Sequence, residues 1–511
     1  MPKQFYLTTP LYYVNARPHI GHAYTTIVAD CLARRHRQQG EDVFLLIGTD
    51  EHGEKIARAA QTAGLSPKEF VDKNSQTFKA LWQSWGISTD RFIRTTDPDH
   101  IQVVQRVLER LKETGALVPG TYTFWYCVPC ETSWTLSDFA DPKSQVCPTC
   151  KRPVEEVTEA DFFLDLEGHR AWLKGHIQAH PEFIQPESRR NETLGMLEKP
   201  LPTLCVTRPK ERVPWGIPVP FSKDHVTYVW FDALLNYVSA LGWPDGERFT
   251  SYWKKAGAIH LIGKDILRHH ALYWPIILHA LGVDPPKTIF AHGWWLIKGE
   301  KISKSKGNIV DPEAVVATYG LDSFRYFLLR DVPFGEDGVF SEEALVKRIN
   351  ADLANDLGNL VYRTLTMLEK HAHGRVPPGQ VDPQLAGEIS VVNQGVETGL
   401  NQMAPDRSLK AIWEFVNRAN RSVEEKAPWT LARQGKRAEL ENFLYQLAES
   451  LRVTALSLWP FLPTTGESIW CQLGFQTPIE KERIPAALQN RIPAGQMIAK
   501  DKPLFPRLES L

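Results

Sequence analysis

The sequence predicts an α/β protein in which a doubly wound parallel sheet is divided by an insertion and followed by an all-helical region. Three observations carry this prediction. Apolar runs of strand length alternate with helical patterns up to about residue 115, an order typical of a parallel sheet covered by helices. Residues 120–224 break that order and are rich in proline, cysteine and aromatic side chains. From Asp311 onward the pattern is almost wholly helical.

The first half of the sheet is predicted from hydrophobic periodicity and from capping residues. Ser66-Pro67-Lys68-Glu69 is a capping box with proline at the first helical position, which marks a helix start. Gly40 is placed to end the helix before it. The expected elements, in chain order, are strand Phe5–Val14, helix His19–Gln39, strand Asp42–Gly48, a helix from Ser66, and a helix from Asp97 to near Gly115.

The alternation resumes after the insertion, at Thr227–Phe231, and continues with apolar runs at Ala258–Gly263 and Thr288–Ile297. The insertion therefore divides one Rossmann-type sheet into two sequence halves. Ser341–Lys370 keeps helical spacing, and helical patterns continue to about Trp459. The proline-rich tail that follows is not assigned to an element.

The composition excludes several classes of protein. A chain of 511 residues is too long for one hydrophobic core. No uncharged apolar stretch is long enough to cross a bilayer, and the first residues resemble neither a secretory signal nor a transit peptide. We therefore expect a cytoplasmic protein that contacts no membrane. Because the net charge is −1, any contact with RNA must come from local basic patches.

The tetrapeptide His19-Ile20-Gly21-His22 follows the first apolar run and opens the first helix. The loop between a parallel strand and a helix is where α/β folds bind nucleotides, and a helix N-terminus attracts phosphate. Two imidazoles can donate to phosphate oxygens, and Gly21 lets an adenine ring approach the backbone. Two incidental surface histidines are the alternative for this motif taken alone.

A second motif, Lys301-Ile302-Ser303-Lys304-Ser305, precedes Lys306-Gly307-Asn308. Its lysines form a cationic loop suited to a triphosphate, and such charge stabilises a transferring phosphate when it arrives as negative charge develops. A solvated lysine-rich turn is the alternative. Because the two motifs occur together in this order, we interpret them as an ATP site built from both halves of one nucleotide-binding fold.

Four of the seven cysteines form two C-x₂-C pairs, Cys127/Cys130 and Cys147/Cys150, with sixteen residues between them. This spacing suits two knuckles that close on one tetrahedral Zn²⁺. Four protein ligands leave no open position, so the ion is expected to be structural. An iron–sulfur site, or free thiols after loss of a metal, are the alternatives.

With both motifs in place, the chain resembles the class I aminoacyl-tRNA synthetases, and in particular the methionyl-tRNA synthetases. The resemblance covers nearly the whole chain. It implies a ligase that activates L-methionine with ATP to methionyl-adenylate and pyrophosphate, then transfers the methionyl group to the 3′-terminal adenosine of elongator and initiator tRNA-Met. The segments most specific to the methionine enzymes are Pro10–Asn15, Gly48–Gly53, Tyr228–Ala233, Gly263–Ile266 and Ala427–Trp429.

The resemblance also implies roles for individual residues, in which Asp50 binds the substrate ammonium and Trp429 stacks on an anticodon base. Catalysis and ATP binding would use His19, Gly21, His22, Asp265, Lys301 and Lys304, with Mg²⁺ accompanying ATP. The methionine site would comprise Leu11, Tyr13, Asp50, Trp230, Tyr237, Ile266 and His270. The anticodon would be read by Asn359, Arg363 and Trp429, and the Zn²⁺ would be held by Cys127, Cys130, Cys147 and Cys150.

The same resemblance predicts the domain limits. These are the first half of the catalytic sheet (1–115), a connective insertion with the zinc knuckle (116–224), the second half of the sheet (225–295), the cationic loop with a region that contacts the tRNA stem (296–345), and a helical anticodon-binding domain with its tail (346–511).

Three departures from the family pattern bear on these expectations. Ile302 stands where the second motif usually has methionine, and it keeps the apolar packing. Leu234 replaces a proline that is common in the pocket wall, which alters the predicted pocket shape. The chain lacks the C-terminal tRNA-binding and dimerising module of longer members, so we expect a monomer.

Three other functional assignments stay open at this point. Synthetases for isoleucine, valine or leucine normally carry a larger editing insertion, and a cysteine enzyme would place zinc at the amino acid. A non-catalytic tRNA-binding paralogue would tolerate loss of His22, Lys304 or Asp50, which are all present. A small-molecule adenylyltransferase with a similar histidine motif would leave the helical half unexplained.

Overall fold

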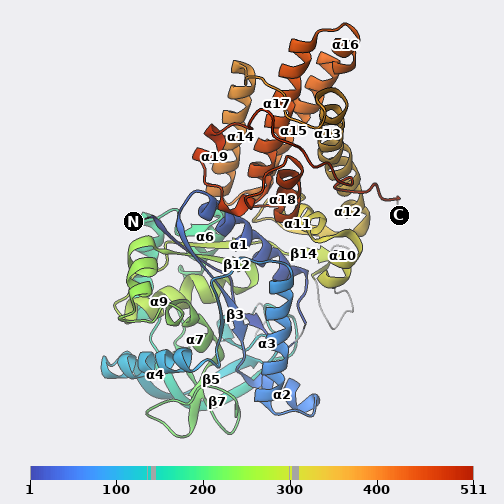
Figure 1. Ribbon diagram of the computed structural model, residues 1–511. Coiled ribbons are helices and arrows are strands. Elements are labelled where there is room, and N and C mark those ends of the chain that lie inside the picture. Colours follow the sequence, from blue (N-terminus) through green and yellow to red (C-terminus); the bar gives the residue numbers. More distant parts are fainter. Residues whose placement is uncertain are drawn as a thin grey trace. The chain divides into compact units, whose positions relative to one another are not determined.

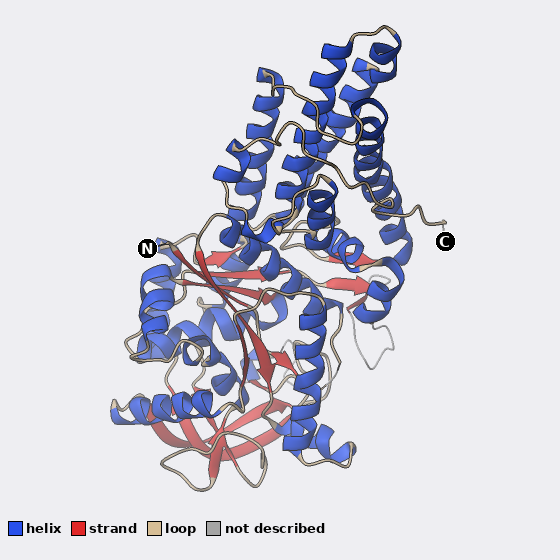
Figure 2. Cartoon of the chain, viewed as in Figure 1, coloured by secondary structure: helices blue, strands red, loops and turns tan. Residues whose placement is uncertain are grey.

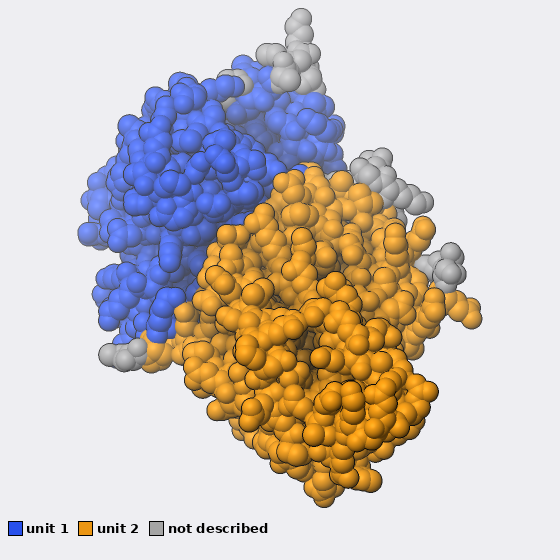
Figure 3. Space-filling model, turned by 90° about the horizontal axis from the view of Figure 1, so that it is seen from above, with its two compact units in different colours: residues 1, 3–18, 43–292 blue, residues 2, 19–42, 293–511 orange. Residues whose placement is uncertain are grey.

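The computed structural model describes residues 2–15, 17–134, 136–139, 145–297, 300–301 and 310–509. Apart from the first two residues, the chain divides into two compact units (Figure 3). Unit 1 comprises residues 3–18 and 43–292, and unit 2 comprises residues 19–42 and 293–511. In the described part of the chain, no helix is both long and apolar enough to cross a membrane.

Unit 1 is built on a seven-stranded sheet in the order β2-β3-β1-β12-β13-β8, with β4 paired to β3. Strand β1 runs parallel to β12, with Tyr6 opposite Ala258, so the sequence halves on either side of the insertion rejoin in one sheet, as predicted. The expected first strand is two strands, because Pro10 lies between them and has no N–H to donate. The strands are β1 (Gln4–Thr8), β2 (Tyr12–Tyr13), β3 (Asp42–Asp50), β4 (Arg91–Arg94), β8 (Ile184–Gln185), β12 (Ala258–Gly263) and β13 (Thr288–His292).

Helices cover this sheet, with α3 on one side of β3 and α7 and α9 on the other (Figure 1). The predicted capping box is confirmed: the Ser66 hydroxyl accepts from the Glu69 N–H at 3.3 Å, and the Glu69 carboxylate accepts from the Ser66 N–H at 3.0 Å. The helices are α2 (Glu54–Thr62), α3 (Pro67–Ser84), α4 (Pro98–Glu113), α7 (Val229–Leu234), α8 (Asn236–Ser239) and α9 (Trp274–Ala280), with π-helices Phe249–Ala256 and His269–Tyr273 and the 3₁₀ turn Lys264–Ile266.

The segment between α4 and α7 forms a second, antiparallel sheet in the order β6-β5-β7-β9. The short strand β8 of the same segment does not join this second sheet. It pairs in parallel with β13 of the main sheet. The elements are β5 (Leu117–Cys127), β6 (Thr132–Trp134), the 3₁₀ turn Leu136–Asp138, β7 (Glu155–Leu164), α5 (Glu167–Ala179), α6 (Glu187–Met196), β9 (Leu204–Cys205), and the hairpin of β10 (Thr207–Pro209) with β11 (His225–Thr227).

Unit 2 is mainly helical (Figure 2) and includes α1 (Ile20–Gln38) from the N-terminal part of the chain. A small sheet in the order β15-β14-β16 contains β14 (Trp295–Ile297), β15 (Glu300–Lys301) and β16 (Gly338–Phe340). The other elements are α10 (Pro312–Tyr319), α11 (Leu321–Arg330), α12 (Glu342–Arg348), the π-helix Ile349–Gly358, α13 (Asn359–Ala372), α14 (Pro383–Asn401), α15 (Pro405–Lys426), α16 (Pro428–Arg433), α17 (Arg437–Leu458), α18 (Pro463–Gln472), the 3₁₀ turn Ile479–Lys481 and α19 (Ala486–Gln489).

A buried ion pair fastens α1 to the C-terminal helices within unit 2. The Asp30 carboxylate lies 2.7 Å from the guanidinium of Arg325 on α11, and both side chains are fully buried. Arg325 also donates to the carbonyls of Phe461 and Pro460, at 2.7 and 3.2 Å, between α17 and α18. Through Arg325, the first helix is thereby linked to the segment between α17 and α18 by an ion pair and by hydrogen bonds.

Candidate functional site

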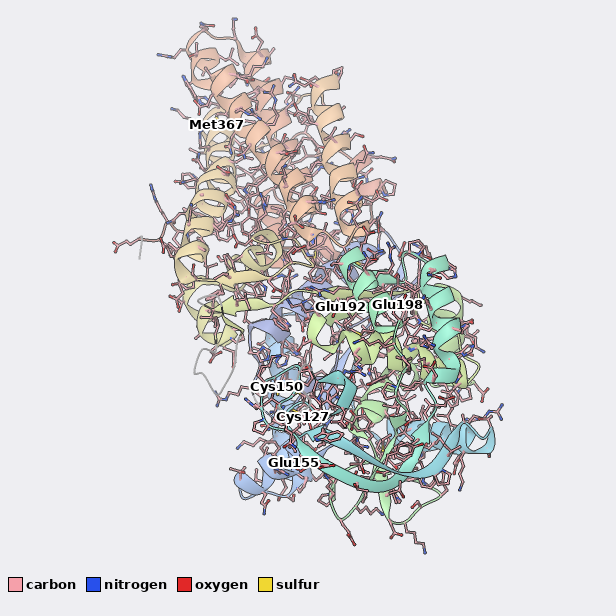
Figure 4. All side chains as sticks on the ribbon, turned by 180° about the vertical axis from the view of Figure 1, so that it is seen from behind. Cys127, Cys150, Glu155, Glu192, Glu198 and Met367 are labelled. Carbon is pink, nitrogen blue, oxygen red and sulfur yellow. The ribbon has the colours of Figure 1, made fainter. Side chains whose placement is uncertain are left out.

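The four paired cysteines come together in the insertion of unit 1, where Figure 4 shows Cys127 beside Cys150. All four sulfur atoms lie within 4.8 Å of one another. The Cys127 and Cys150 sulfurs are 3.5 Å apart, and those of Cys147 and Cys130 are 3.9 Å apart. A tetrahedral ion with bonds of about 2.3 Å would separate its sulfur ligands by about 3.8 Å. The cluster can therefore hold a metal ion.

Asp50 ends β3 and leaves one carboxylate oxygen without a partner. Its side chain is 8% exposed, and among the described atoms Oδ1 has no hydrogen-bond donor. Burial, followed by the carboxylates of Asp232 and Glu131, raises the pKa of Asp50 well above its ordinary value. Because an unpaired buried carboxylate is costly, this position favours a ligand that brings a positive charge.

The turn that follows Asp50 is held rigidly. Both carboxylate oxygens of Glu51 accept from Arg94 at 2.7 Å. The Trp215 indole donates to the Glu51 carbonyl at 2.6 Å, and the Gly53 N–H donates to the Trp215 carbonyl at 3.1 Å. These contacts fix the backbone that carries Asp50.

Asp232 at the start of α7 joins this turn to α4. His52 Nδ1 and His100 Nε2 each lie 2.7 Å from its carboxylate, and all three side chains are buried. Burial opposes ionisation of Asp232, but the two imidazoles outweigh it and lower the pKa of that carboxyl. Our reading of the sequence assigned no role to Asp232, His52 or His100, although Asp232 and His52 lie in segments that carry the resemblance.

Four predicted wall residues are half-buried and border the main hydrophobic cluster of unit 1: Leu11, Tyr13, Trp230 and Ile266. The Trp230 ring stacks on His269 at 3.7 Å between ring centroids, and the Tyr13 ring lies 5.0 Å from the Lys55 ammonium. Partly exposed apolar side chains of this kind suit an uncharged substrate side chain.

Tyr237 and His270 form a buried polar pair beside these walls. The Tyr237 hydroxyl lies 2.8 Å from His270 Nε2, and His270 Nδ1 lies 3.0 Å from the Ile266 carbonyl. Since a carbonyl can only accept, Nδ1 carries the proton and Nε2 accepts from Tyr237. Burial lowers the pKa of His270 to about 4, so the ring is neutral near pH 7.

In unit 2, the first motif caps α1. His19 is the N-cap residue: its Nδ1 accepts from the Gly21 N–H at 3.1 Å, and the His22 Nδ1 accepts from the His19 N–H at 3.4 Å. The two imidazole rings stack with centroids 3.7 Å apart. A Cβ atom at Gly21 would lie 2.9 Å from the His19 ring, so a larger residue there would displace the imidazole.

The second motif lies mostly outside the described residues. Lys304 is among the residues outside them, and of Lys301 only the backbone is described, paired with Leu296 in the small sheet. Trp295, which precedes Leu296, packs its ring edge against Tyr24 of α1 with centroids 5.7 Å apart. The strand that leads into the second motif therefore packs on the helix that carries the first.

The remaining predicted residues, Asp265, Asn359, Arg363 and Trp429, are exposed or half-buried. Asp265 is exposed in the turn after β12, at the carboxyl end of a parallel strand. In the helical region, Trp429 on α16 is 43% exposed, more than is expected of a residue that only packs between helices. Asn359 is exposed on α13, and Arg363 pairs with Glu424 of α15 at 2.7 Å.

Comparisons with known proteins agree with this geometry. A family profile described as "tRNA synthetases class I (M)" matches residues 5–156 and 130–365. The class defined by the parallel sheet, the histidine-capped helix and this match is the class I tRNA synthetases.

Similar curated proteins and solved structures identify the family within this class. Methionine–tRNA ligase of Caldanaerobacter subterraneus subsp. tengcongensis is 46% identical over 100% of this chain and 80% of its own length. That of Thermotoga maritima is 42% identical over 99% of this chain and 81% of its own length. The crystal structure of Mycobacterium tuberculosis methionyl-tRNA synthetase bound by methionyl-adenylate matches with a TM-score of 0.93 and 39% identity, covering 99% of this chain and all of that one. The chain belongs to the methionine–tRNA ligase family.

Proposed function

We propose that the protein is an ATP-dependent methionine–tRNA ligase. The observation that carries this proposal is the carboxylate oxygen of Asp50 that has no hydrogen-bond partner in the described part of the chain. It lies on a fixed turn in the unit that also holds the half-buried apolar walls. An amino acid with a positive ammonium and an uncharged thioether side chain matches both features. A thioether gains roughly 0.3–1.5 kcal/mol from contact with aromatic rings, which Tyr13 and Trp230 can supply.

The reaction has two steps. A carboxylate oxygen of methionine attacks the α-phosphorus of ATP, which forms methionyl-adenylate and expels pyrophosphate. A hydroxyl of the 3′-terminal adenosine of tRNA-Met then attacks the methionyl carbonyl, and AMP leaves. No protein nucleophile is required, so alignment and charge stabilisation account for the rate.

We assign ATP binding to His19, Gly21, His22, Asp265, Lys301 and Lys304, with Mg²⁺ accompanying the nucleotide. The partial positive charge at the N-terminus of α1, which His19 caps, favours phosphate. The packing of Trp295 on Tyr24 joins the strand that precedes the second motif in the sequence to this helix. Methionine would contact Leu11, Tyr13, Asp50, Trp230, Tyr237, Ile266 and His270.

The test of the function is ATP–pyrophosphate exchange measured with each of the twenty amino acids. Methionine is expected to support exchange far better than any other. Exchange driven by a different amino acid would assign the chain to another substrate. Binding of tRNA-Met without any exchange would indicate a non-catalytic tRNA-binding protein.

We also propose that the four-cysteine cluster holds one structural Zn²⁺, because four thiolates and sulfur separations of 3.5 and 3.9 Å suit tetrahedral coordination. Elemental analysis of the purified chain should find one zinc per molecule. Cys147→Ser should lower that content and the thermal stability of the insertion, because structural zinc contributes folding free energy. Cys205→Ser, a change at a buried cysteine outside the cluster, is the control and should keep the metal.

The helical region is proposed to bind the anticodon of tRNA-Met through Asn359, Arg363 and Trp429. Stacking of a base on an aromatic ring contributes about 1–3 kcal/mol, so Trp429→Ala should raise the apparent KM for tRNA by roughly ten- to a hundredfold. Methionine-dependent exchange without tRNA should not change. Val391→Ala on α14, an apolar position that is 66% exposed, should leave both assays unaffected. Unaltered tRNA kinetics in Trp429→Ala would remove this residue from the interface.

A further inference from the structure

Glu131 is a buried acidic residue with no assigned role, and it directly follows the metal-binding Cys130 in the sequence. It is 4% exposed and its backbone has a left-handed φ of 51°. The turn from Cys127 to Glu131 is closed by N–H donation from Cys130 to Cys127 and from Glu131 to Val128, each at 3.2 Å. This turn therefore places the Glu131 side chain in the interior of unit 1.

Three separate donors meet Glu131 there. The Tyr13 hydroxyl donates to carboxylate oxygen Oε2 at 2.6 Å, and the Lys55 backbone N–H donates to Oε1 at 3.1 Å. The Tyr228 hydroxyl donates to the Glu131 carbonyl at 2.5 Å. One residue thus connects β2, which carries Tyr13, with the start of α2 and with the segment that leads into α7, the helix of Trp230.

The fit between these groups is close. Gly53 has a φ of +105°, and a Cβ atom there would lie 2.5 Å from Glu131 Oε1 and 2.9 Å from the Tyr13 hydroxyl. The Tyr13 hydroxyl also lies 3.0 Å from the His52 carbonyl. The turn that leads away from Asp50 is therefore packed directly against the Glu131 carboxylate and the Tyr13 ring.

We propose that Glu131 is a positioning residue for the amino-acid site: by holding the Tyr13 hydroxyl with one oxygen and the Lys55 N–H with the other, it fixes the aromatic wall relative to the Asp50 turn. The inference rests on the proposed function, since it concerns binding of methionine. The Cys127/Cys130 knuckle then has two roles, because Glu131, which follows Cys130, also positions the wall of the proposed methionine site.

The test is Glu131→Gln, which keeps the size of the side chain but replaces one acceptor oxygen with an NH₂ group. The remaining amide oxygen can accept from only one of the two donors. An NH₂ group that faces the Lys55 N–H loses that hydrogen bond, and one that faces Tyr13 makes the hydroxyl an acceptor and turns its proton to the His52 carbonyl, 3.0 Å away. Loss of a buried hydrogen bond corresponds to about a tenfold change in an equilibrium constant. We therefore expect KM for methionine in the exchange assay to rise about tenfold, with kcat and KM for ATP within about threefold of the unchanged chain.

A double-mutant cycle separates positioning from a general structural effect. Tyr13→Phe removes the same hydrogen bond from the other side, so the pair Tyr13→Phe/Glu131→Gln should raise KM for methionine no further than the larger single change. The matched control is Glu155→Gln. Glu155, labelled in Figure 4, starts β7 in the same insertion and is 60% exposed, 3.9 Å from Arg212. Glu155→Gln should behave as the unchanged chain does.

Two further measurements are made on each variant: methionine binding, monitored by tryptophan fluorescence, and zinc content. Weaker methionine binding by Glu131→Gln with zinc retained supports the proposal. Additive effects in the double variant, equal increases in KM for methionine and ATP, or loss of zinc from Glu131→Gln would each overturn it. If Glu131→Gln fails to fold, Glu131→Asp and Tyr13→Phe carry the same comparison. Absence of methionine-dependent exchange in the unchanged chain would instead refute the proposed function.

Discussion

Replacing Asp50 with asparagine is expected to lower kcat/KM for methionine in pyrophosphate exchange by roughly a thousandfold. Removing one partner of a buried charge pair costs about 2–5 kcal/mol, and about 4 kcal/mol corresponds to three powers of ten. Asparagine keeps the shape of the side chain and one acceptor oxygen, so the loss reports the negative charge. The measurement is exchange rate against methionine concentration at saturating ATP.

Two observations check this result. Asp245→Asn changes an aspartate of the same unit that is 83% exposed, and it should leave the kinetics unaltered. A fall smaller than tenfold for Asp50→Asn would mean that this carboxylate does not bind the ammonium group.

The same residue also predicts a pH effect on the unchanged chain. Since burial and the neighbouring carboxylates of Asp232 and Glu131 raise the pKa of Asp50, it takes up a proton at a pH where ordinary aspartates remain ionised. The protonated form cannot pair with ammonium, so KM for methionine should rise as pH falls through that raised pKa. Asp50→Asn should remove this dependence.

Replacing Arg325 with methionine is expected to destabilise unit 2 by about 3–5 kcal/mol, the usual cost of breaking a buried ion pair from one side. Arg325 and Asp30 are fully buried and 2.7 Å apart. The change would remove from Asp30 a fully buried cation, although Arg34 stays at 2.9 Å, and would strip two carbonyls of the Arg325 donor. The urea midpoint followed by far-ultraviolet circular dichroism should fall accordingly.

The control is an ion pair of the same length in a different environment. Arg437 and Glu441 of α17 are also 2.7 Å apart, but the Arg437 side chain is 81% exposed. Exposed pairs contribute about 0–1 kcal/mol, so Arg437→Met should barely shift the midpoint. Similar shifts for both changes would show that burial does not govern the strength of the Arg325 contact.

The sequence predicted the layers of the fold well because each layer has its own local signal. The apolar run Ala258–Gly263 and the capping box at Ser66 give a strand and a helix where expected. Two features had no such signal. Local patterns do not say that Tyr6 lies opposite Ala258, and they do not place α1 in the unit of the C-terminal helices. Both depend on contacts between residues far apart in the sequence.

The candidate site was predicted less completely. The cysteines could be recognised because ligand spacing is a local property, and their convergence is confirmed. Asp50 came only from the resemblance, and its missing hydrogen-bond partner is visible only in three dimensions. Glu131 was missed because a lone glutamate after a C-x₂-C pair is ordinarily a solvated surface residue. Its burial depends on Tyr13 and Tyr228, more than ninety residues away in the chain.

The attachment of α1 also decides which parts of this chain can be expressed separately or exchanged between homologues. The far end of the helix is bound by Gln38, whose side chain donates to the Leu456 carbonyl and whose own carbonyl accepts from Ile484, both at 2.8 Å. A fragment that stopped before residue 346 would keep Arg325 but would remove both partners of Gln38, Leu456 and Ile484, and uncover that end of the helix to water. A chimera that takes its helical region from a homologue would therefore need a first helix whose end fits the new partners.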